Sequence, residues 1–258
     1  MNRGESDRIH ALSGGLHRLA RTEIAANEDS QVMKPETSTG KAHVTLSEYE
    51  SKRRLARYDI PIVREELAAS FTGALEAMHR IGFPVALKGC GAGLAHKTER
   101  GIVELNLSTD TAVKQAYQRI VERAAQQVDG VLVQEMVVGR RELICGLTRD
   151  DQFGPCVMLG LGGIFVEAIR DVVFRVAPIE VRDACEMMDE LKGRALFAAF
   201  RGEQAVDRET LARVLVSLGR IGIEEPDVVS VDINPLIVRD GMPIAVDALV
   251  VLCSSEVA

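Results

Sequence analysis

The chain of 258 residues lacks several features that mark particular classes of protein. Trp is absent and aromatic residues make up 4%, which argues against the exposed rings that stack single-stranded nucleic acid. The 38 acidic residues outnumber the 31 basic ones, so a broad surface for a phosphate backbone is not expected. No apolar run reaches the roughly 18 residues of a membrane span, and the N-terminus has no apolar signal region. We therefore expect a cytoplasmic protein that binds neither nucleic acid nor membrane.

The five cysteines and five histidines are not spaced as disulfide or metal sites. No CxxC pair occurs, and several cysteines lie inside apolar runs, which is typical of buried free thiols in a reducing compartment. Cys90, in an expected loop, is the only nucleophile candidate among them. The histidines have no metal-ligand spacing, so structural zinc is not expected.

Periodicity and turn residues divide the chain into an extension and an ordered region. Residues 1–43 are polar and without sustained period, so we expect a mobile extension. In residues 44–258 helix and strand patterns alternate without strict βαβ order, and several strands follow one another through short turns. This order predicts an α+β fold with a mixed or antiparallel sheet, and not a Rossmann sheet.

Local signals place the expected elements. Thr45 and Glu48 fit a capping box, and Ser108 and Asp207 fit helix N-caps. Gly82 fits a helix end, and Arg239–Gly241 fits a hairpin turn. We expect helical segments over residues 45–58, 69–81, 108–128, 181–200 and 207–221. We expect strands over residues 83–87, 102–107, 131–136, 142–147, 156–161, 172–176, 228–238 and 244–251.

The first candidate site is Lys88 at the end of an apolar strand, followed by a Gly-rich loop. Gly89 and Gly91 let backbone N–H groups approach a phosphate, and the ammonium group of Lys88 neutralises its charge. The pattern is neither a Walker A loop nor GxGxxG, and a plain flexible hairpin is the alternative. His96 in this loop is either a structural histidine or a nucleophile or phosphate contact.

The second candidate site joins Glu135 and Met136, at a strand end, to Glu142 on the next strand. Backbone groups and the carboxylates there are suited to lining a nucleotide pocket. The alternative is a pair of solvated acids at strand ends.

The third candidate site contains Asp232 and Asn234, which share one face of a strand. The hairpin turn brings Asp247 near Asn234 on the partner strand. An amide and a carboxylate are hard oxygen ligands of the kind that Mg²⁺ prefers. The alternative is an Asn-Pro turn beside a cross-strand polar pair.

Seven segments occur in an order that resembles a known family. They are Lys88 with its glycine loop, His96–Glu99, Gln134–Met136, Gly160–Gly163 with Val166–Glu167, Arg175–Pro178, Leu191–Gly193 and Asp232–Leu236. Over about residues 45–252 the chain resembles the ATP-grasp β subunit or domain of ADP-forming acyl-CoA synthetases, relatives of succinyl-CoA synthetase. The resemblance implies the ATP-grasp fold, in which two α+β subdomains clasp a nucleotide, here about residues 44–135 and 136–252.

The resemblance also implies roles in binding ATP or ADP. Lys88 would hold the α and β phosphates. The segment Glu135–Met136 would meet adenine, and Glu142 would lie near the adenosine moiety.

Further roles concern metal binding and phosphoryl transfer. Asn234 and Asp247 match the Mg²⁺ ligands, and Asp232 occupies the position of the acid that faces the phosphohistidine of the family. His96 matches a histidine that relays phosphate within this subunit in some members.

In this family a CoA-binding α subunit supplies the thioester site and the main phosphohistidine. The overall reaction is acyl-CoA + ADP + phosphate ⇌ acid + ATP + CoA. This chain contains no CoA-binding domain, so the resemblance implies an α partner through which acyl-CoA and phosphate bind. Its loop also departs from the family, with Gly89–Gly93 where many members have Ser and Pro. Two alternatives remain: a non-catalytic ATP-grasp module for nucleotide sensing or scaffolding, and an ATP-grasp carboxylate–amine ligase that works alone.

Overall fold

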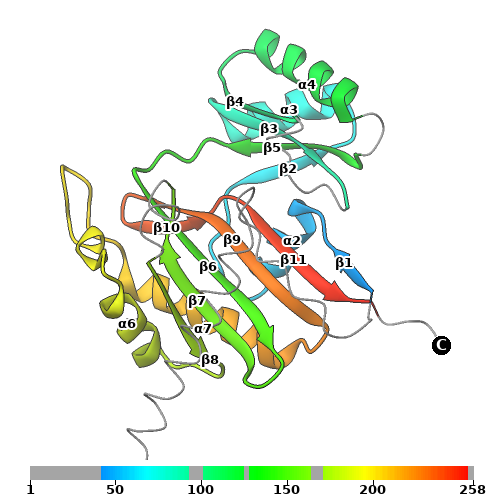
Figure 1. The fold of residues 1–258 in the computed structure, drawn as a ribbon. Helices are drawn as coiled ribbons and strands as arrows, with labels where there is room; N and C mark the ends of the chain where they lie inside the picture. The colour runs from blue at the N-terminus through cyan, green and yellow to red at the C-terminus, as the bar shows by residue number, and fades with distance from the viewer. Residues whose placement is uncertain (1–41, 93–100, 125–127, 164–170, 255–258) are drawn as a thin grey trace, which may run out of the picture. The chain divides into compact units, whose positions relative to one another are not determined.

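A computed structural model of the chain describes residues 42–92, 101–124, 128–163 and 171–254. In this part the named strands pair antiparallel and form two sheets (Figure 1). The predicted α+β fold without Rossmann crossovers is confirmed by this pairing. Residues 1–41 of the predicted extension and residues 93–100 of the predicted loop lie outside the described residues.

The larger sheet has seven strands, in the spatial order β1, β11, β9, β6, β7, β8, with β10 paired to β9. Their bounds are β1 (His43–Thr45), β6 (Arg141–Asp150), β7 (Gly154–Leu161), β8 (Val172–Val176), β9 (Val228–Arg239), β10 (Met242–Ala245) and β11 (Ala248–Cys253). The helical elements that pack with it are α2 (Glu48–Ala56), α6 (Val181–Glu190), the 3-10 turn η1 (Arg194–Phe197) and α7 (Arg208–Glu224).

One core lies between this sheet and its helices. Leu55 of α2, Met187 of α6 and Leu215 of α7 are fully buried in it with Val231 and Ile233 of β9. Because side chains alternate along a strand, the residues between and beyond Val231 and Ile233 point to the opposite face. The core packing of β9 therefore directs the polar residues of the third candidate site away from the helices.

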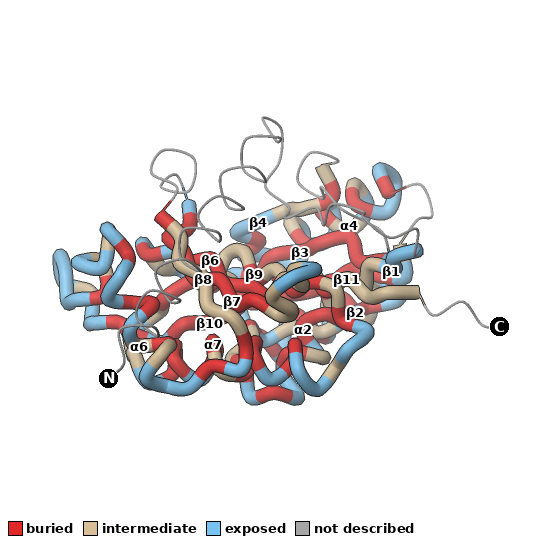
Figure 2. The backbone as a smooth tube through the Cα atoms, turned by 60° about the horizontal axis from the view of Figure 1, so that its bottom comes forward, coloured by how far each residue is buried: buried red, intermediate tan, exposed pale blue. Residues whose placement is uncertain are grey.

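The smaller sheet has four strands, in the order β2, β5, β3, β4. Their bounds are β2 (Glu65–Ala68), β3 (Val85–Cys90), β4 (Val103–Leu107) and β5 (Gly130–Glu135), and α3 (Phe71–Ile81) and α4 (Asp110–Ala124) cover one face (Figure 1). Every residue of the central strands β3 and β5 is buried, as the colours of Figure 2 show for β3. Ser70 caps the start of α3 and Gly82, with a φ of 92°, ends it.

The start of α2 differs from the prediction. Ser47, and not Thr45, is the N-cap, and Glu50 closes the capping box. The reason is non-local: residues 43–45 form β1, in which Thr45 pairs with Val251 of β11. The carboxylate of Glu48 meanwhile bonds to buried lysines. β1 and α2 thus pack with the larger sheet, whereas the sequence analysis grouped them with the first subdomain.

Other helix and strand boundaries also differ from those predicted. The helix expected from Ser108 begins at Asp110, because the hydroxyl of Thr109 accepts the N–H of Ala112. The strand expected over residues 244–251 is divided into β10 and β11, and β2 was not predicted.

The five cysteines form no disulfide with one another; three of them are buried and two are half-buried. Cys90 is buried at the end of β3, so its expected place in a loop was wrong. Among the residues described, none of the helices has the length and apolar character needed to cross a bilayer.

Candidate functional site

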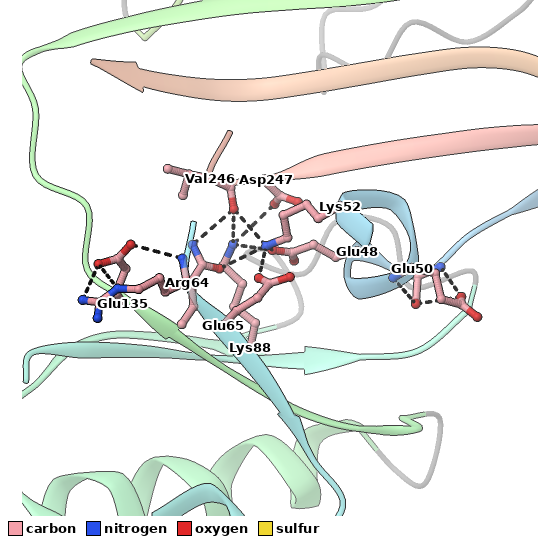
Figure 3. A network of polar contacts seen from close by, with 11 residues as sticks. Glu48, Glu50, Lys52, Arg64, Glu65, Lys88, Glu135, Val246 and Asp247 are labelled. Atoms are coloured by element: carbon pink, nitrogen blue, oxygen red, sulfur yellow. Dashed lines mark hydrogen bonds and ion pairs between the residues drawn. The ribbon is translucent and has the colours of Figure 1, made fainter. Parts of the chain in front are cut away.

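Lys88 projects from β3, the strand that lies between β4 and β5. Its side chain is 7% exposed, and its Nζ donates to Oε1 of Glu48 at 2.7 Å. The same nitrogen lies 3.5 Å from the carbonyl oxygen of Val246 and 3.8 Å from Oδ2 of Asp247 (Figure 3). Lys88 of the smaller sheet therefore meets residues that pack with the larger one.

A second buried lysine, Lys52 of α2, shares these partners. Its Nζ lies 2.7 Å from the same Oε1 of Glu48, 3.2 Å from the carbonyl oxygen of Val246 and 3.4 Å from Oε1 of Gln134. It also forms an ion pair with Glu65. Nε2 of Gln134 donates to the Val246 carbonyl at 3.1 Å. The side chains converge on this one carbonyl group (Figure 3).

The charges of this cluster shift the pKa values of two members. Burial lowers the pKa of Lys88, but the carboxylates of Asp247 and Glu48 outweigh it and hold the pKa above its ordinary value. Lys88 therefore stays cationic. Burial raises the pKa of Glu65 to about 7, against the opposing charge of Lys52. Within the described part of the chain, Oε1 of Glu65 makes no hydrogen bond.

Asn234 and Asp247 lie opposite each other at the junction of β9 with β10 and β11. The backbone N–H of Asn234 donates to the carbonyl of Asp247 at 3.2 Å. The tight turn Asp240–Gly241, in which both residues have positive φ, pairs β10 back onto β9 and sets this register. Both side chains are half-buried. The turn therefore brings together the two residues predicted to bind metal.

Asp232 adds a second carboxyl group beside Asp247. Burial of this group, and then the negative charge of Asp247, raise the pKa of Asp232 to about 7. A cation would relieve this repulsion, and hard oxygen donors suit Mg²⁺. No group of three or more His, Cys, Asp or Glu side chains forms a metal-ligand set within the described residues. The donors present fit a site in which Mg²⁺ takes its remaining ligands from water or a phosphate.

Glu135 is not a solvated acid. Its carboxylate accepts the backbone N–H of Arg64 at 3.1 Å, the guanidinium of Arg64 at 2.8 Å and that of Arg239 at 3.3 Å. Burial raises its pKa, but these bonds outweigh it and lower the pKa below the ordinary value. The N–H groups of Glu135 and Met136 donate to the carbonyls of Arg64 and Pro84. The carboxylate of Glu135 is thus engaged by two arginines.

Glu142 is exposed at the start of β6, next to the glycine turn that follows β7. Its carbonyl accepts the N–H of Gly162 at 2.7 Å. A Cβ atom on Gly162 would lie 2.8 Å from the carbonyl carbon of Glu142, and one on Gly163 would lie 3.2 Å from its Oε2. The close approach of Glu142 therefore requires glycine at Gly162.

The remaining predicted residues lie near Lys88 in the chain. Gly89 belongs to β3, where its N–H donates to the carbonyl of Ile102 at 2.8 Å, so its expected place in a loop was wrong. Gly91 is buried just beyond the strand. His96 lies outside the described residues.

The sequence analysis did not single out Glu48, Lys52 and Glu65 as members of this site. One signal was available for the first two. Glu48, Lys52 and Leu55 are spaced four and three residues apart, which places both charges on the buried stripe of α2. Glu65 has no such signal, because β2 was not predicted.

Comparison with known proteins identifies the family of the chain. Residues 38–252 match the ATP-grasp domain family. The chain is 39% identical over 212 residues to the β subunit of acetate–CoA ligase [ADP-forming] I of Pyrococcus furiosus, covering 80% of this chain and 91% of the relative. It is 35% identical over 202 residues to acetate–CoA ligase [ADP-forming] I of Archaeoglobus fulgidus, covering 77% of this chain and 30% of that longer relative.

A solved structure shows the same fold. The dinucleotide-forming acetyl-coenzyme A synthetase 1 of Ca. Korarchaeum cryptofilum, in complex with coenzyme A, Ca-AMPCP and HgCl+, matches with a TM-score of 0.77. The match is 41% identical and covers 81% of this chain and 93% of that one. The chain therefore has the ATP-grasp fold and belongs to the family of β subunits of ADP-forming acetate–CoA ligases.

Proposed function

We propose that this chain is the subunit of an ADP-forming acyl-CoA synthetase that binds the nucleotide, with Lys88 on its phosphates and Asn234 and Asp247 on its Mg²⁺. One observation supports the proposal above all. Nζ of Lys88 lies 3.8 Å from Oδ2 of Asp247, and Asn234 is hydrogen-bonded to the backbone of Asp247. A cationic group thus lies beside the carboxylate of Asp247, and the backbone bond makes Asn234 the neighbour of Asp247, as binding the phosphate tail of a nucleotide with its Mg²⁺ requires.

Each residue of this site has a defined contribution. Lys88 binds and orients phosphate oxygens, and its raised pKa keeps it charged as it does so. Mg²⁺, when bound by Asn234 and Asp247, neutralises charge on the phosphates. Asp232, whose carboxyl group lies beside Asp247, would accept a hydrogen bond from a histidine that faces it. His96 accepts the phosphoryl group from ATP, which releases ADP, and then transfers it to the histidine of the α partner, which leaves His96 unmodified again.

We propose an α partner that supplies CoA binding, because the ATP-grasp match takes up residues 38–252 of this chain. The Pyrococcus relative is a β subunit, whereas the match covers 30% of the Archaeoglobus relative. The remainder of that longer chain has the length to hold the partner functions. Acyl-CoA and phosphate would bind through this partner.

Titration calorimetry of the full chain with MgATP tests the nucleotide site. Asn234→Ala and Asp247→Ala should each weaken MgATP binding by about tenfold or more, because each removes a metal ligand. Asp227→Asn is the matched control, since it neutralises an acid that directly precedes β9 and pairs with Arg54. Unchanged affinity in both Asn234→Ala and Asp247→Ala would refute the metal assignment.

The activity is tested by mixing the chain with a CoA-binding α subunit, acetyl-CoA, ADP, phosphate and Mg²⁺. We expect ATP formation that His96→Ala abolishes. Nucleotide binding without ATP formation in this mixture would instead indicate the non-catalytic module.

A further inference from the structure

We propose that Glu48 and Lys52 of α2 are positioning residues for Lys88. Glu48 fixes the ammonium group of Lys88, and Lys52 supplies the second positive charge that compensates the buried Glu48 carboxylate. The inference rests on the proposed function of Lys88 as the phosphate-binding lysine.

The geometry of Glu48 carries the first part of this inference. Glu48 is 1% exposed. One of its two carboxylate oxygens, Oε1, accepts hydrogen bonds from both Lys52 and Lys88, each at 2.7 Å. A Lys side chain loses more rotamer freedom than most when it is fixed. Holding Lys88 in place before the nucleotide arrives removes this cost from binding, which is the principle of preorganisation.

Helix α2, which carries Glu48, is held against the larger sheet by a hydrogen bond and by core packing. The hydroxyl of Ser51 accepts the N–H of Val250 in β11 at 3.0 Å, and Leu55 is fully buried in the larger core. The capping box of Ser47 and Glu50 closes the first turn, next to Glu48. Glu48 therefore projects from a helix that is tied to the sheet of the candidate metal site.

The second part of the inference concerns Lys52. Two carboxylates, Glu48 and Glu65, lie against its ammonium group, and all three side chains are at most 3% exposed. A buried carboxylate without a partner is strongly disfavoured. Without Lys52, the carboxylates of Glu48 and Glu65 would have only the ammonium group of Lys88 as a cationic neighbour among the described residues. Lys52 pairs with both carboxylates and leaves Lys88 able to face Asp247.

The carbonyl of Val246 links these groups to the metal site. It lies 3.2 Å from Nζ of Lys52 and 3.5 Å from Nζ of Lys88, and it accepts from Gln134. Val246 directly precedes Asp247 in the chain. The network thus fixes the ammonium group of Lys88 relative to the segment that bears the proposed metal ligand.

A double-mutant cycle on the full chain tests this inference. MgATP affinity is measured for the unchanged chain, Glu48→Gln, Lys88→Met and the double variant. Displacement of a fluorescent ATP analogue keeps weak binding measurable. If Glu48 acts through Lys88, Glu48→Gln should weaken binding about fivefold or more in the unchanged chain and have no further effect beside Lys88→Met. A purely structural role would weaken binding equally in both backgrounds.

Two further variants support this test, one as a control and one as a substitute if Glu48→Gln does not fold. Glu209→Gln breaks an exposed Glu–Arg pair of the same helical spacing on α7 and should leave MgATP affinity unchanged. If Glu48→Gln fails to fold, Glu48→Gln is combined with Lys52→Met and Glu65→Gln, so that the loss of Lys52 leaves no buried carboxylate without a cation. This triple variant should show the same loss of affinity, and the same absence of effect beside Lys88→Met.

The outcomes separate the inference from the proposed function. If Lys88→Met binds MgATP as tightly as the unchanged chain, the proposed role of Lys88 is refuted and the inference with it. If Lys88→Met weakens binding while Glu48→Gln has no effect, or an equal effect in both backgrounds, the inference alone is refuted.

Discussion

Replacing Glu65 with glutamine should stabilise the chain at pH 8 and change its stability little at pH 5. Glu65 lies on β2 with a side chain that is 3% exposed, in an ion pair with Lys52. Its Oε1 makes no hydrogen bond in the part of the chain that the structure describes. Glutamine keeps the shape of the side chain, resembles the protonated acid at every pH, and still offers an oxygen to Lys52.

The size of the effect follows from the pKa. Burial raises the pKa of Glu65 from 4.5 to about 7, more than the charge of Lys52 lowers it. Since one pKa unit corresponds to about 1.4 kcal/mol, the ionised side chain costs the folded chain about 3 kcal/mol. The folded state binds the proton more tightly than the unfolded state, so this stability is lost as the pH rises from 4.5 to about 7. The loss is complete above that range.

Thermal unfolding of both chains at pH 5, 6, 7 and 8 measures this difference. At pH 8 Glu65→Gln should unfold about 6–12 °C above the unchanged chain, as about 3 kcal/mol implies for a domain of this size. Most of the difference should vanish by pH 5. Asp232 also titrates in this range, but it is present in both chains and cancels.

Glu66→Gln is the matched control. Glu66 is the next residue of β2, but its side chain is 38% exposed and its bond to Arg80 lowers its pKa. Its replacement should give no stabilisation that grows towards pH 8. A Glu65→Gln difference that is the same at pH 5 and pH 8, or a loss of stability at pH 8, would refute the reasoning.

Two further predictions concern local structure. Asp207→Ala should cost about 1 kcal/mol in urea unfolding, because its carboxylate accepts the N–H groups of Glu209 and Thr210 at the start of α7; Asp207→Asn should lose less, and equal losses would contradict the capping role. Gly162→Ala should cost about 1–3 kcal/mol, because the new Cβ would lie 2.8 Å from the backbone of Glu142. Unchanged urea unfolding of Gly162→Ala would show that β6 and the glycine turn separate without cost.

The features predicted correctly depend on residues close together in the sequence. Asp207 caps α7, Gly82 ends α3, and the turn Asp240–Gly241 has the positive φ values that a tight hairpin needs. Each of these signals acts within a few residues. The same turn also allowed the approach of Asp247 to Asn234 to be predicted.

The features that were missed depend on distant partners. Thr45 and Ser47 both begin capping-box patterns, and the pairing of β1 with β11 makes Ser47 the cap. Glu65 lies in a strand that has no alternating apolar pattern of its own and exists through pairing with β5. Glu48 and Lys52 have the spacing of an ordinary surface ion pair. Their register with Leu55 places both on the buried stripe of α2, but the partners that make them part of the site, Lys88 and Glu65, lie on strands far away in the sequence.

The pairing of β1 with β11 also bears on how such a domain joins other domains. His43 lies opposite Cys253, and the N–H of Ser254 donates to the carbonyl of Ala42 at 2.7 Å, so the points where the chain enters and leaves the domain are neighbours. A domain whose two ends are neighbours can be inserted into a longer polypeptide or can form a separate chain. Neither arrangement requires a linker that runs around the domain. Relatives of both lengths, a separate subunit and a segment of a larger ligase, are what such geometry permits.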